Sequence, residues 1–249
     1  MKRVFVIVAA LTLTAFFTGC KKDDHSNGKI FYGTPQNVGD GTIRSYVEFD
    51  GKGIPQSIGF NFTKSMLTGL PNDGTTPTYM TMLDLPKEAA ITGFNHLELD
   101  WNPNGHEPMD IYGLPHFDFH LYIVGMDELM QIVPGPDMTP VEPQYIPEDY
   151  ESGVIAVPNM GVHWLDMTSP EFHGETFSTT YIYGFYHGNM LFGEPMITLA
   201  YLQSQPDVTL DVKQPAEFQK PGYYPTKYRI SFDKKDQSYS VSLEGLVKH

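Results

Sequence analysis

The chain has 249 residues, 41% of them hydrophobic, and carries 16 basic against 30 acidic side chains, for a formal net charge of −14. Such an excess of negative charge repels nucleic acid phosphates and anionic lipid surfaces, so no nucleic-acid partner is expected. The length and apolar content are typical of one sizeable domain with its own core.

The first residues have the organisation of a secretory signal. Lys2 and Arg3 form a basic start, and the apolar run 4–17 is too short for a comfortable membrane span. The run ends in FTGC, which resembles the lipobox of bacterial lipoproteins, where the cysteine is lipidated and becomes the new N-terminus. We therefore predict a signal peptide over 1–19, lipidation of Cys20 and a flexible tether over 20–29. The alternative is an uncleaved N-terminal anchor.

The cysteine content and the residues after Cys20 indicate a compartment. Cys20 is the only cysteine, which excludes an internal disulfide and a thiolate metal cluster. The KKDD that follows resembles the surface-export signal of some Gram-negative lipoproteins. We expect an exported protein that is attached to the outer membrane through its lipid. The KKDD segment favours the cell exterior, and the choice between the periplasmic and the external face stays open. The stability of such a protein must then come from its own core or from metals.

Short segments of strand composition dominate the rest of the chain, with Gly and Pro between them. They are 42–49, 54–62, 79–86, 95–101, 116–124, 153–158, 160–166, 179–186 and 195–202, and a C-terminal hairpin flanks DKKDQ. Only TKSMLTGLP and MDELMQIV (126–133) have the pattern of helices.

These elements predict an all-β fold, because the long helices that a parallel sheet needs between its strands are absent. The expected architecture is an antiparallel β-sandwich or a partly closed barrel with one or two short helices. We expect a single domain over 30–249, with the motifs in 40–203 and a C-terminal hairpin extension over 204–249.

Seven of the nine histidines fall between residues 96 and 187, and PHFDFHLY (115–122) is the densest motif. Alternation along a strand puts His116, Asp118 and His120 on one face and the two phenylalanines on the other. On a straight strand His116 and His120 are about 13 Å apart, so they cannot share an ion unless the strand bulges. Asp118 can converge on one ion with either histidine. A helix beginning at Pro115 is disfavoured, because it would point the two phenylalanines to different sides.

Other ligands must come from elsewhere in the chain. The turn WNPNGHEP offers a histidine and a glutamate, VPNMGVHWLD a second strand with a histidine, and FGEPM a glutamate. The predicted metal ligands are His106, His116, His120, His163 and Glu194. Imidazoles with a carboxylate suit a divalent Zn, Fe, Mn or Cu ion. Glu107 and Asp118 are the candidate catalytic proton carriers, and Tyr112 or Tyr122 could orient a substrate. His96 and His173 are expected to be structural.

Two other interpretations stay open. His116-x-Asp118 with a distant His163 or His187 resembles the facial triad of jelly-roll iron oxygenases. Two observations argue against that reaction. An exported protein is not supplied with the usual keto-acid cosubstrate, and basic residues that could bind its carboxylate are scarce, since Arg44 and Arg229 are the only arginines after Arg3. In the other interpretation the His/Asp face is a polar network in a non-catalytic surface-binding or envelope-structural module. The sequence does not decide whether the protein is an enzyme, and it leaves open a small-molecule ligand and a homo-oligomer.

The motifs GHEP, PHFDFHLY, VPNMGVHWLD, IYGFYHG and EPMIT together resemble the TTHB210-like family of exported bacterial proteins of unknown function. The resemblance would cover about residues 40–203. It implies a β-rich domain and supports grouping the same histidines, and it implies no activity and no catalytic residue.

Overall fold

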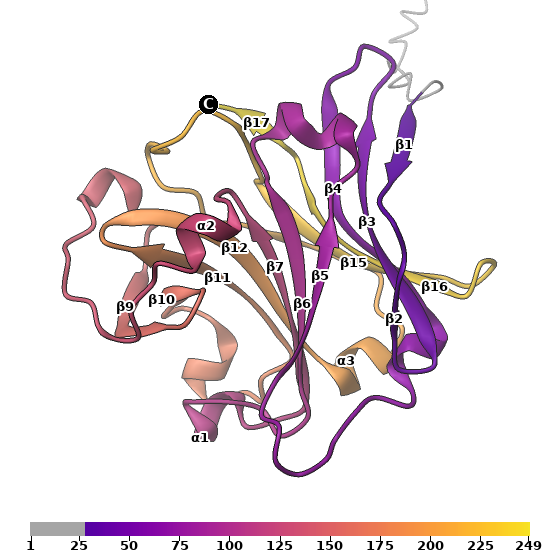
Figure 1. Cartoon of the computed structure of the whole chain (residues 1–249), viewed down its shortest axis with the longest axis horizontal. Coiled ribbons are helices and arrows are strands. Elements are labelled where there is room, and N and C mark those ends of the chain that lie inside the picture. The colour runs from indigo at the N-terminus through magenta and orange to yellow at the C-terminus, as the bar shows by residue number, and fades with distance from the viewer. Residues whose placement is uncertain (1–27) are drawn as a thin grey trace, which may run out of the picture.

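The computed structural model describes residues 28–249, which form two antiparallel sheets packed on each other and a small two-stranded sheet (Figure 1). The prediction of an all-β antiparallel sandwich is confirmed, and the sheets of these residues do not close into a barrel. The predicted signal peptide, the lipidated Cys20 and most of the predicted tether lie outside the described residues. None of the helices within residues 28–249 has the length and apolar character that a bilayer crossing requires.

The first sheet has seven strands in the order β1-β3-β4-β16-β15-β13, with β2 paired to β3. Its strands are β1 (Lys29–Tyr32), β2 (Gln36–Val38), β3 (Gly41–Phe49), β4 (Pro55–Thr63), β13 (Val208–Asp211), β15 (Lys227–Asp233) and β16 (Ser238–Glu244). The predicted C-terminal hairpin is β15–β16. Since β16 pairs with β4 as well as with β15, this hairpin is built into the middle of the sheet.

The second sheet has eight strands in the order β5-β6-β7-β12-β11-β10-β9-β8. Its strands are β5 (Tyr79–Asp84), β6 (His96–Asn102), β7 (His116–Tyr122), β8 (Gly135–Pro136), β9 (Tyr150–Val157), β10 (Gly161–Asp166), β11 (Thr179–Tyr186) and β12 (Asn189–Thr198). β14 (Tyr223–Tyr224) and β17 (Val247–Lys248) form the small third sheet.

The helices are short connections between strands. They are the 3₁₀ turns η1 (Lys64–Leu67), η2 (Lys87–Thr92), η3 (Pro143–Tyr145) and η4 (Pro170–His173), and the α-helices α1 (Met109–Tyr112), α2 (Met126–Leu129) and α3 (Leu199–Gln203). TKSMLTGLP forms only η1. The helix predicted over 126–133 has about half its expected length. After Leu129 the backbone N–H groups of Gln131 and Ile132 bond to carbonyls three residues back, which is the tighter 3₁₀ spacing.

The strand predicted over 195–202 is wrong in its second half. β12 ends at Thr198, whose hydroxyl oxygen accepts a hydrogen bond from the Tyr201 backbone N–H at 3.2 Å. A threonine in this position caps a helix and satisfies a backbone donor that a strand would pair with its neighbour. The chain therefore turns into α3, and β12 extends instead in the other direction to Asn189.

The main core lies between the two large sheets and takes one face of β7. The Phe119 ring centroid is 5.0 Å from that of Phe60 on β4, and Tyr181 on β11 is 5.7 Å from Tyr228 on β15. Each such aromatic side chain removes a large apolar area from water, so this pairing fixes which face of β7 turns inward. The opposite, polar face of β7 must then point away from the seven-stranded sheet.

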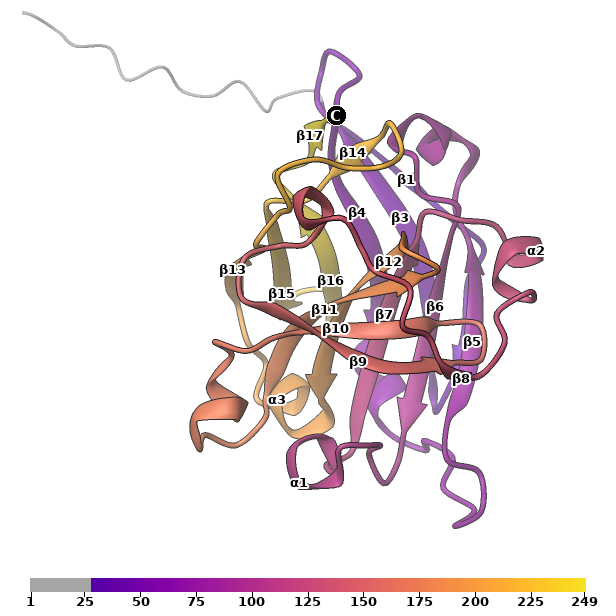
Figure 2. The ribbon, with the colours of Figure 1, turned by 90° about the vertical axis from the view of Figure 1, so that its left-hand side faces the viewer.

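The eight-stranded sheet curves over its own outer face. Hydrogen bonding continues from β7 through β12 and β11 to β10, β9 and β8. Figure 2 shows β9 and β10 crossing in front of β6 and β7, and Figure 1 shows them to one side of these strands. The polar face of β7 therefore lies on the concave side of this sheet. This explains why His116 and His120 are fully buried although they face away from the main core.

Candidate metal centre

β7 is a regular strand over the whole HFDFHLY segment. Its pairing with β6 runs from His96↔Tyr122 to Asn102↔His116 without a register shift. Phe117 and Phe119 enter the main core, and the histidines lie on the concave face. Because β7 has no bulge, strand geometry separates its two histidines. They fall into two different groups of potential metal ligands.

β6 adds a second row of polar side chains that the sequence analysis did not include. Glu98 lies opposite His120, Asp100 opposite Asp118 and Asn102 opposite His116. All of these side chains are buried. The signal was present in HLELDWN, where charged and polar residues alternate with leucine and tryptophan as they do in HFDFHLY.

The first group, which we call the His106 cluster, consists of His106, His116 and Asp118. Asp118 Oδ1 is 3.2 Å from His116 Nε2, and Asp118 Oδ2 is 3.5 Å from His106 Nε2. The side-chain amide of Asn102 donates a hydrogen bond to Asp118 Oδ2 at 2.6 Å. His106 comes from the loop before α1, as the turn in WNPNGHEP predicts, and its ring centroid lies 4.6 Å from that of His116.

The second group, the His120 cluster, consists of His120, His163 and Glu194. The β7–β12 register, with Gly193↔Leu121 and Met196↔Asp118, places Glu194 opposite His120. Glu194 Oε2 is 3.4 Å from His120 Nε2 and 3.7 Å from His163 Nε2. Three strands, β7, β12 and β10, thus supply one ligand each.

A bulge opposite His163 shapes this second cluster. Between the pairs Val162↔Ala156 and Trp164↔Ser152, His163 alone faces the three β9 residues 153–155. Val154 takes a φ of 61°, which is rare for a β-branched residue. Bulges of this kind bend a strand and re-aim a side chain. The strand spacing in the sequence allowed a bulge on β7 as a way to bring ligands together. The structure has a regular β7 and a bulge on β9 instead.

A glycine makes room for the ring that packs against both histidines of the His120 cluster. The Phe192 ring lies edge-on to His120 at 4.8 Å and approaches His163 at 5.7 Å between centroids. A Cβ on Gly184 would lie 2.1 Å from Phe192 Cε1. Only glycine fits here, so Gly184 positions the imidazoles through this ring.

Replacing this glycine should disturb the cluster. We expect Gly184→Ala to cost about 1–3 kcal/mol of unfolding free energy, because Phe192 must move out of a packed position. The measurement is urea unfolding followed by circular dichroism. Gly125→Ala is the control, since its Cβ would meet nothing closer than 3.6 Å. Equal stability of the two variants would contradict this role of Gly184.

Four ligand atoms of the two clusters are buried without a hydrogen-bond partner. Within residues 28–249 this holds for His116 Nε2, Asp118 Oδ1, His120 Nε2 and Glu194 Oε2. Unpartnered buried polar atoms are costly. Two atoms bound to one zinc ion at about 2.0–2.1 Å in tetrahedral geometry lie about 3.4 Å apart. The observed separations of 3.2–3.7 Å match that spacing.

Backbone carbonyls orient two of the imidazoles. His116 Nδ1 lies 2.6 Å from the Leu114 carbonyl oxygen, and His106 Nδ1 lies 2.8 Å from that of Glu107. With the Nδ1–H donating to the carbonyl, Nε2 is the nitrogen that faces Asp118 and that an ion would take. This hydrogen bond on the outer nitrogen is the usual support of a metal-binding histidine.

Charge also distinguishes the imidazoles. Burial alone would lower the pKa of His106 and that of His120. The nearby Asp118 carboxylate outweighs burial and raises the pKa of His106 to about 9. The Glu194 carboxylate does the same for His120 and raises its pKa to about 10. Burial lowers the pKa of His163. For Asp118, burial opposes ionisation, yet His116 and His106 hold its pKa well below the usual range. Each metal-free cluster therefore contains a protonated imidazole at neutral pH.

Zinc affinity should consequently rise with pH. Below the raised pKa of His106 and His120 the imidazole carries a proton that an ion must displace, and above it no proton competes. We expect about one proton released per ion and about a tenfold gain in affinity per pH unit for each proton, up to about pH 9. Calorimetry in buffers of different ionisation enthalpy measures the protons. An affinity that is constant between about pH 6.5 and 8.5 would contradict this expectation.

The other predicted residues lie outside the two clusters. Glu107 is exposed, and its carboxylate accepts a hydrogen bond from the Met109 backbone N–H at the start of α1. Tyr112 is buried, and its hydroxyl is 3.4 Å from Glu171. Tyr122 stacks between His96 and His120. His96 and His173 are in neither cluster.

The distal histidine of the facial-triad interpretation is not brought to His116 and Asp118. His163 joins Glu194 and His120 instead, and His187 lies exposed at the β11–β12 turn, stacked on Tyr186. The third member beside His116 and Asp118 is His106. Each cluster nevertheless has two histidines and one carboxylate.

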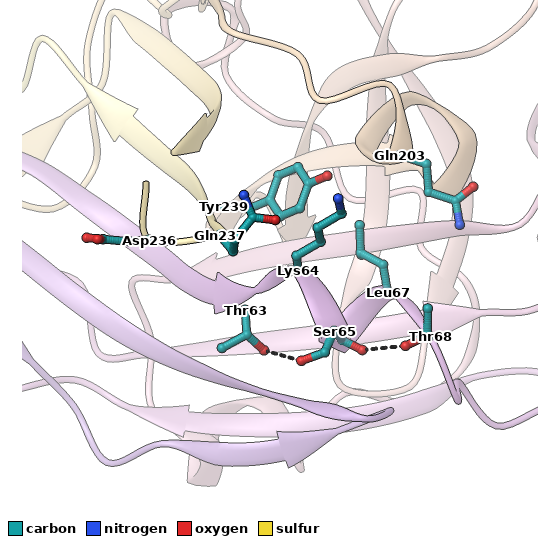
Figure 3. Close-up of a pocket in the computed structure, with 9 residues that line it drawn as sticks. All are labelled: Thr63, Lys64, Ser65, Leu67, Thr68, Gln203, Asp236, Gln237 and Tyr239. Carbon is teal, nitrogen blue, oxygen red and sulfur yellow. Dashed lines mark hydrogen bonds between the residues drawn. The ribbon is translucent and has the colours of Figure 1, made fainter. Parts of the chain in front are cut away.

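A separate cavity of about 640 Å³ lies at η1, the end of α3 and the β15–β16 turn (Figure 3). Its lining residues are Thr63, Lys64, Ser65, Leu67, Thr68, Gln203, Asp236, Gln237 and Tyr239. No member of either histidine cluster lines it, and it brings together no set of metal-binding side chains.

The TTHB210-like family model, described as Hypothetical protein TTHB210, matches residues 50–101. The match is shorter than the expected 40–203. It ends at Trp101, before GHEP, the first of the motifs that carry the resemblance, and it contains His96, Glu98 and Asp100. No curated protein and no solved structure matches the chain. The predicted resemblance to the TTHB210-like family is thereby confirmed over residues 50–101.

Proposed function

We propose that this protein is a metalloprotein of the cell envelope, lipid-anchored through Cys20, that binds divalent ions at the His106 and His120 clusters. The observation that carries the proposal is the spacing of imidazole nitrogens and carboxylate oxygens, 3.2–3.7 Å, in two sets of two imidazoles and one carboxylate. Within residues 28–249, four of these atoms are buried without a hydrogen-bond partner. This ligand set suits Zn²⁺ and Fe²⁺ best among the expected metals.

Three protein ligands leave a coordination position open, as in catalytic rather than structural zinc sites. The side chains of His106 and His163 are 39% and 25% exposed, whereas the remaining ligands are almost fully buried. The open positions are therefore reached past these two histidines. Bound there, a divalent ion can polarise an oxygen of a small-molecule ligand or activate water.

The protein side chains have distinct roles in this proposal. Asp118 contacts two imidazoles at once and acts as a ligand rather than as a proton carrier. Glu107 adjoins the more exposed histidine of the His106 cluster and is itself exposed. It is the better candidate to carry a proton between the site and water.

Cobalt tests the metal proposal, because Co²⁺ in a low-coordinate His/carboxylate site absorbs visible light. We expect the untagged protein to develop these bands on titration with Co²⁺. His163→Ala should lose about half of the intensity, since it removes one of two clusters. His173→Ala should lose none, because this exposed histidine is in neither cluster. A wild-type protein without such bands would favour a polar network in a binding or envelope-structural module.

The envelope proposal rests on Lys2, Arg3, the apolar run and FTGC. Its test is palmitate labelling and membrane fractionation in a bacterial host. Wild-type protein should be labelled and sediment with outer membranes, and Cys20→Ala should be unlabelled. Equal labelling of the two proteins would overturn the assignment of Cys20.

A further inference from the structure

Two buried carboxylates on β6 adjoin the His120 cluster. Glu98 and Asp100 point to the same face because they are two residues apart on a strand, and their exposed fractions are 5% and 0%. Both side-chain oxygens of Asp100 lack a hydrogen-bond partner within the described part of the chain.

Among the described residues, His120 is the imidazole that groups with these two carboxylates. β7 lies between β6 and β12, so Glu98 and Asp100 flank His120 on the side opposite Glu194. Ligand atoms of Glu98, Asp100 and His120 all lie within 4.8 Å of one another. His120 is fully buried, and Nδ1 as well as Nε2 is unpartnered in the described residues. The second nitrogen thus has no backbone carbonyl like those that orient His106 and His116.

Lysine and arginine do not compensate these acids. In residues 28–249, the ion pairs of Lys213, Lys220, Lys227 and Arg229 go to other carboxylates. Two buried carboxylates with one shared imidazole and no lysine or arginine are costly, and binding a divalent ion relieves that cost.

We propose that Glu98, Asp100 and the second ring nitrogen of His120 form an additional cation subsite, so that the His120 imidazole bridges two ions. The inference rests on the proposed function, because the Nε2 side of His120 must already hold an ion. The new subsite has two carboxylates and one nitrogen, so its ligand set is chemically harder than that of the His120 cluster. This set suits Mn²⁺, Fe²⁺ or Zn²⁺. When both ions are bound, the ring releases its remaining N–H proton to solvent.

Such a bridge gives the ring a role that a single site does not require. Two ions on one imidazole are held at a fixed separation, and each lowers the basicity of the nitrogen facing the other. Neighbouring ions can polarise two atoms of the same ligand. The ligand class is therefore a small molecule with two oxygen donors, such as a carboxylate or a phosphate ester.

Zinc stoichiometry by native mass spectrometry tests the subsite. The untagged full chain is loaded with Zn²⁺, and the double variant Glu98→Gln/Asp100→Asn is compared with it. We expect the variant to lose one equivalent of zinc and to keep the ions of the His106 and His120 clusters. Asp84→Asn on neighbouring β5, an exposed acid, is the matched control and should lose none.

Folding is checked on the metal-free proteins. The amide side chains have nearly the same shape and carry no charge, so the metal-free double variant should melt at or above the wild-type temperature. A double variant that binds as much zinc as wild type overturns the subsite and leaves the proposed function intact. Wild-type protein that binds no zinc overturns both.

Copper tests the bridge itself. Two Cu²⁺ ions joined by one imidazolate couple their electron spins, so we expect the spin count of the copper-loaded wild type to be below its copper content. The double variant should recover a spin count equal to its copper content. A wild-type spin count equal to its copper content would overturn the bridging role of His120.

Discussion

Removing bound metal should lower the melting temperature by about 10–20 °C. An ion present at 100 times its dissociation constant adds about 2.7 kcal/mol, so two independent clusters add about 5 kcal/mol. For a domain of this size each kcal/mol corresponds to about 2–4 °C. Calorimetric melts in excess zinc and in excess EDTA measure the difference.

Two controls separate metal binding from a general salt effect. Adding zinc beyond the chelator should restore the higher melting temperature. Magnesium should not, because it prefers an octahedral shell of oxygen ligands and both clusters are rich in imidazole. Identical melts in zinc and in EDTA would be incompatible with ions at these clusters.

His120→Ala should be the most damaging single substitution in the site. His120 is fully buried and is the positive partner of Glu194 when metal is absent. Its removal leaves Glu194 and Asp100 as uncompensated buried acids, which costs about 3–5 kcal/mol in the metal-free protein. The variant should also lose the ion of the His120 cluster while the His106 cluster keeps its own. Urea unfolding and metal analysis provide the two readouts.

A second substitution identifies the cause of this loss. Adding Glu194→Gln to His120→Ala removes the buried carboxylate charge that has lost its partner, so it should recover part of the unfolding free energy. His173→Ala should stay within about 0.5 kcal/mol of wild type, because this exposed histidine lies outside both clusters. A cost below about 1 kcal/mol for His120→Ala, with full metal content, would argue against the site.

The fold class and the polar face of β7 were predictable because they depend on local alternation. In HFDFHLY the phenylalanines must be buried together, and this alone decides that His116, Asp118 and His120 share the other face. Strand spacing also predicted that His116 and His120 would not meet at one ion, and in the structure they lie in separate clusters. The turn at Gly105 likewise indicated that His106 could approach this strand.

The pairing of the ligands depends on long-range register, which no local pattern reports. Glu194 faces His120 because β12 is the neighbour of β7, and β12 follows β7 by about 70 residues in the chain. His163 reaches the same place because the sheet curves and β9 bulges at 153–155. Glu98 and Asp100 alternate with apolar residues in the sequence, but only the pairing of β6 with β7 places them beside His120. β12 ends at Thr198 because Thr198 caps α3, and the strand-like composition of residues 195–202 gives no sign of this cap.

The central claim, that ions occupy the two clusters, is tested most directly by metal content. The protein is purified without a histidine tag, stripped with chelator, reloaded with zinc, desalted and analysed by elemental mass spectrometry. We predict at least two equivalents in wild type and about one equivalent less in each of His116→Ala and His163→Ala. Less than about 0.1 equivalent in the reloaded wild type, with melting unchanged by chelator, would contradict the claim.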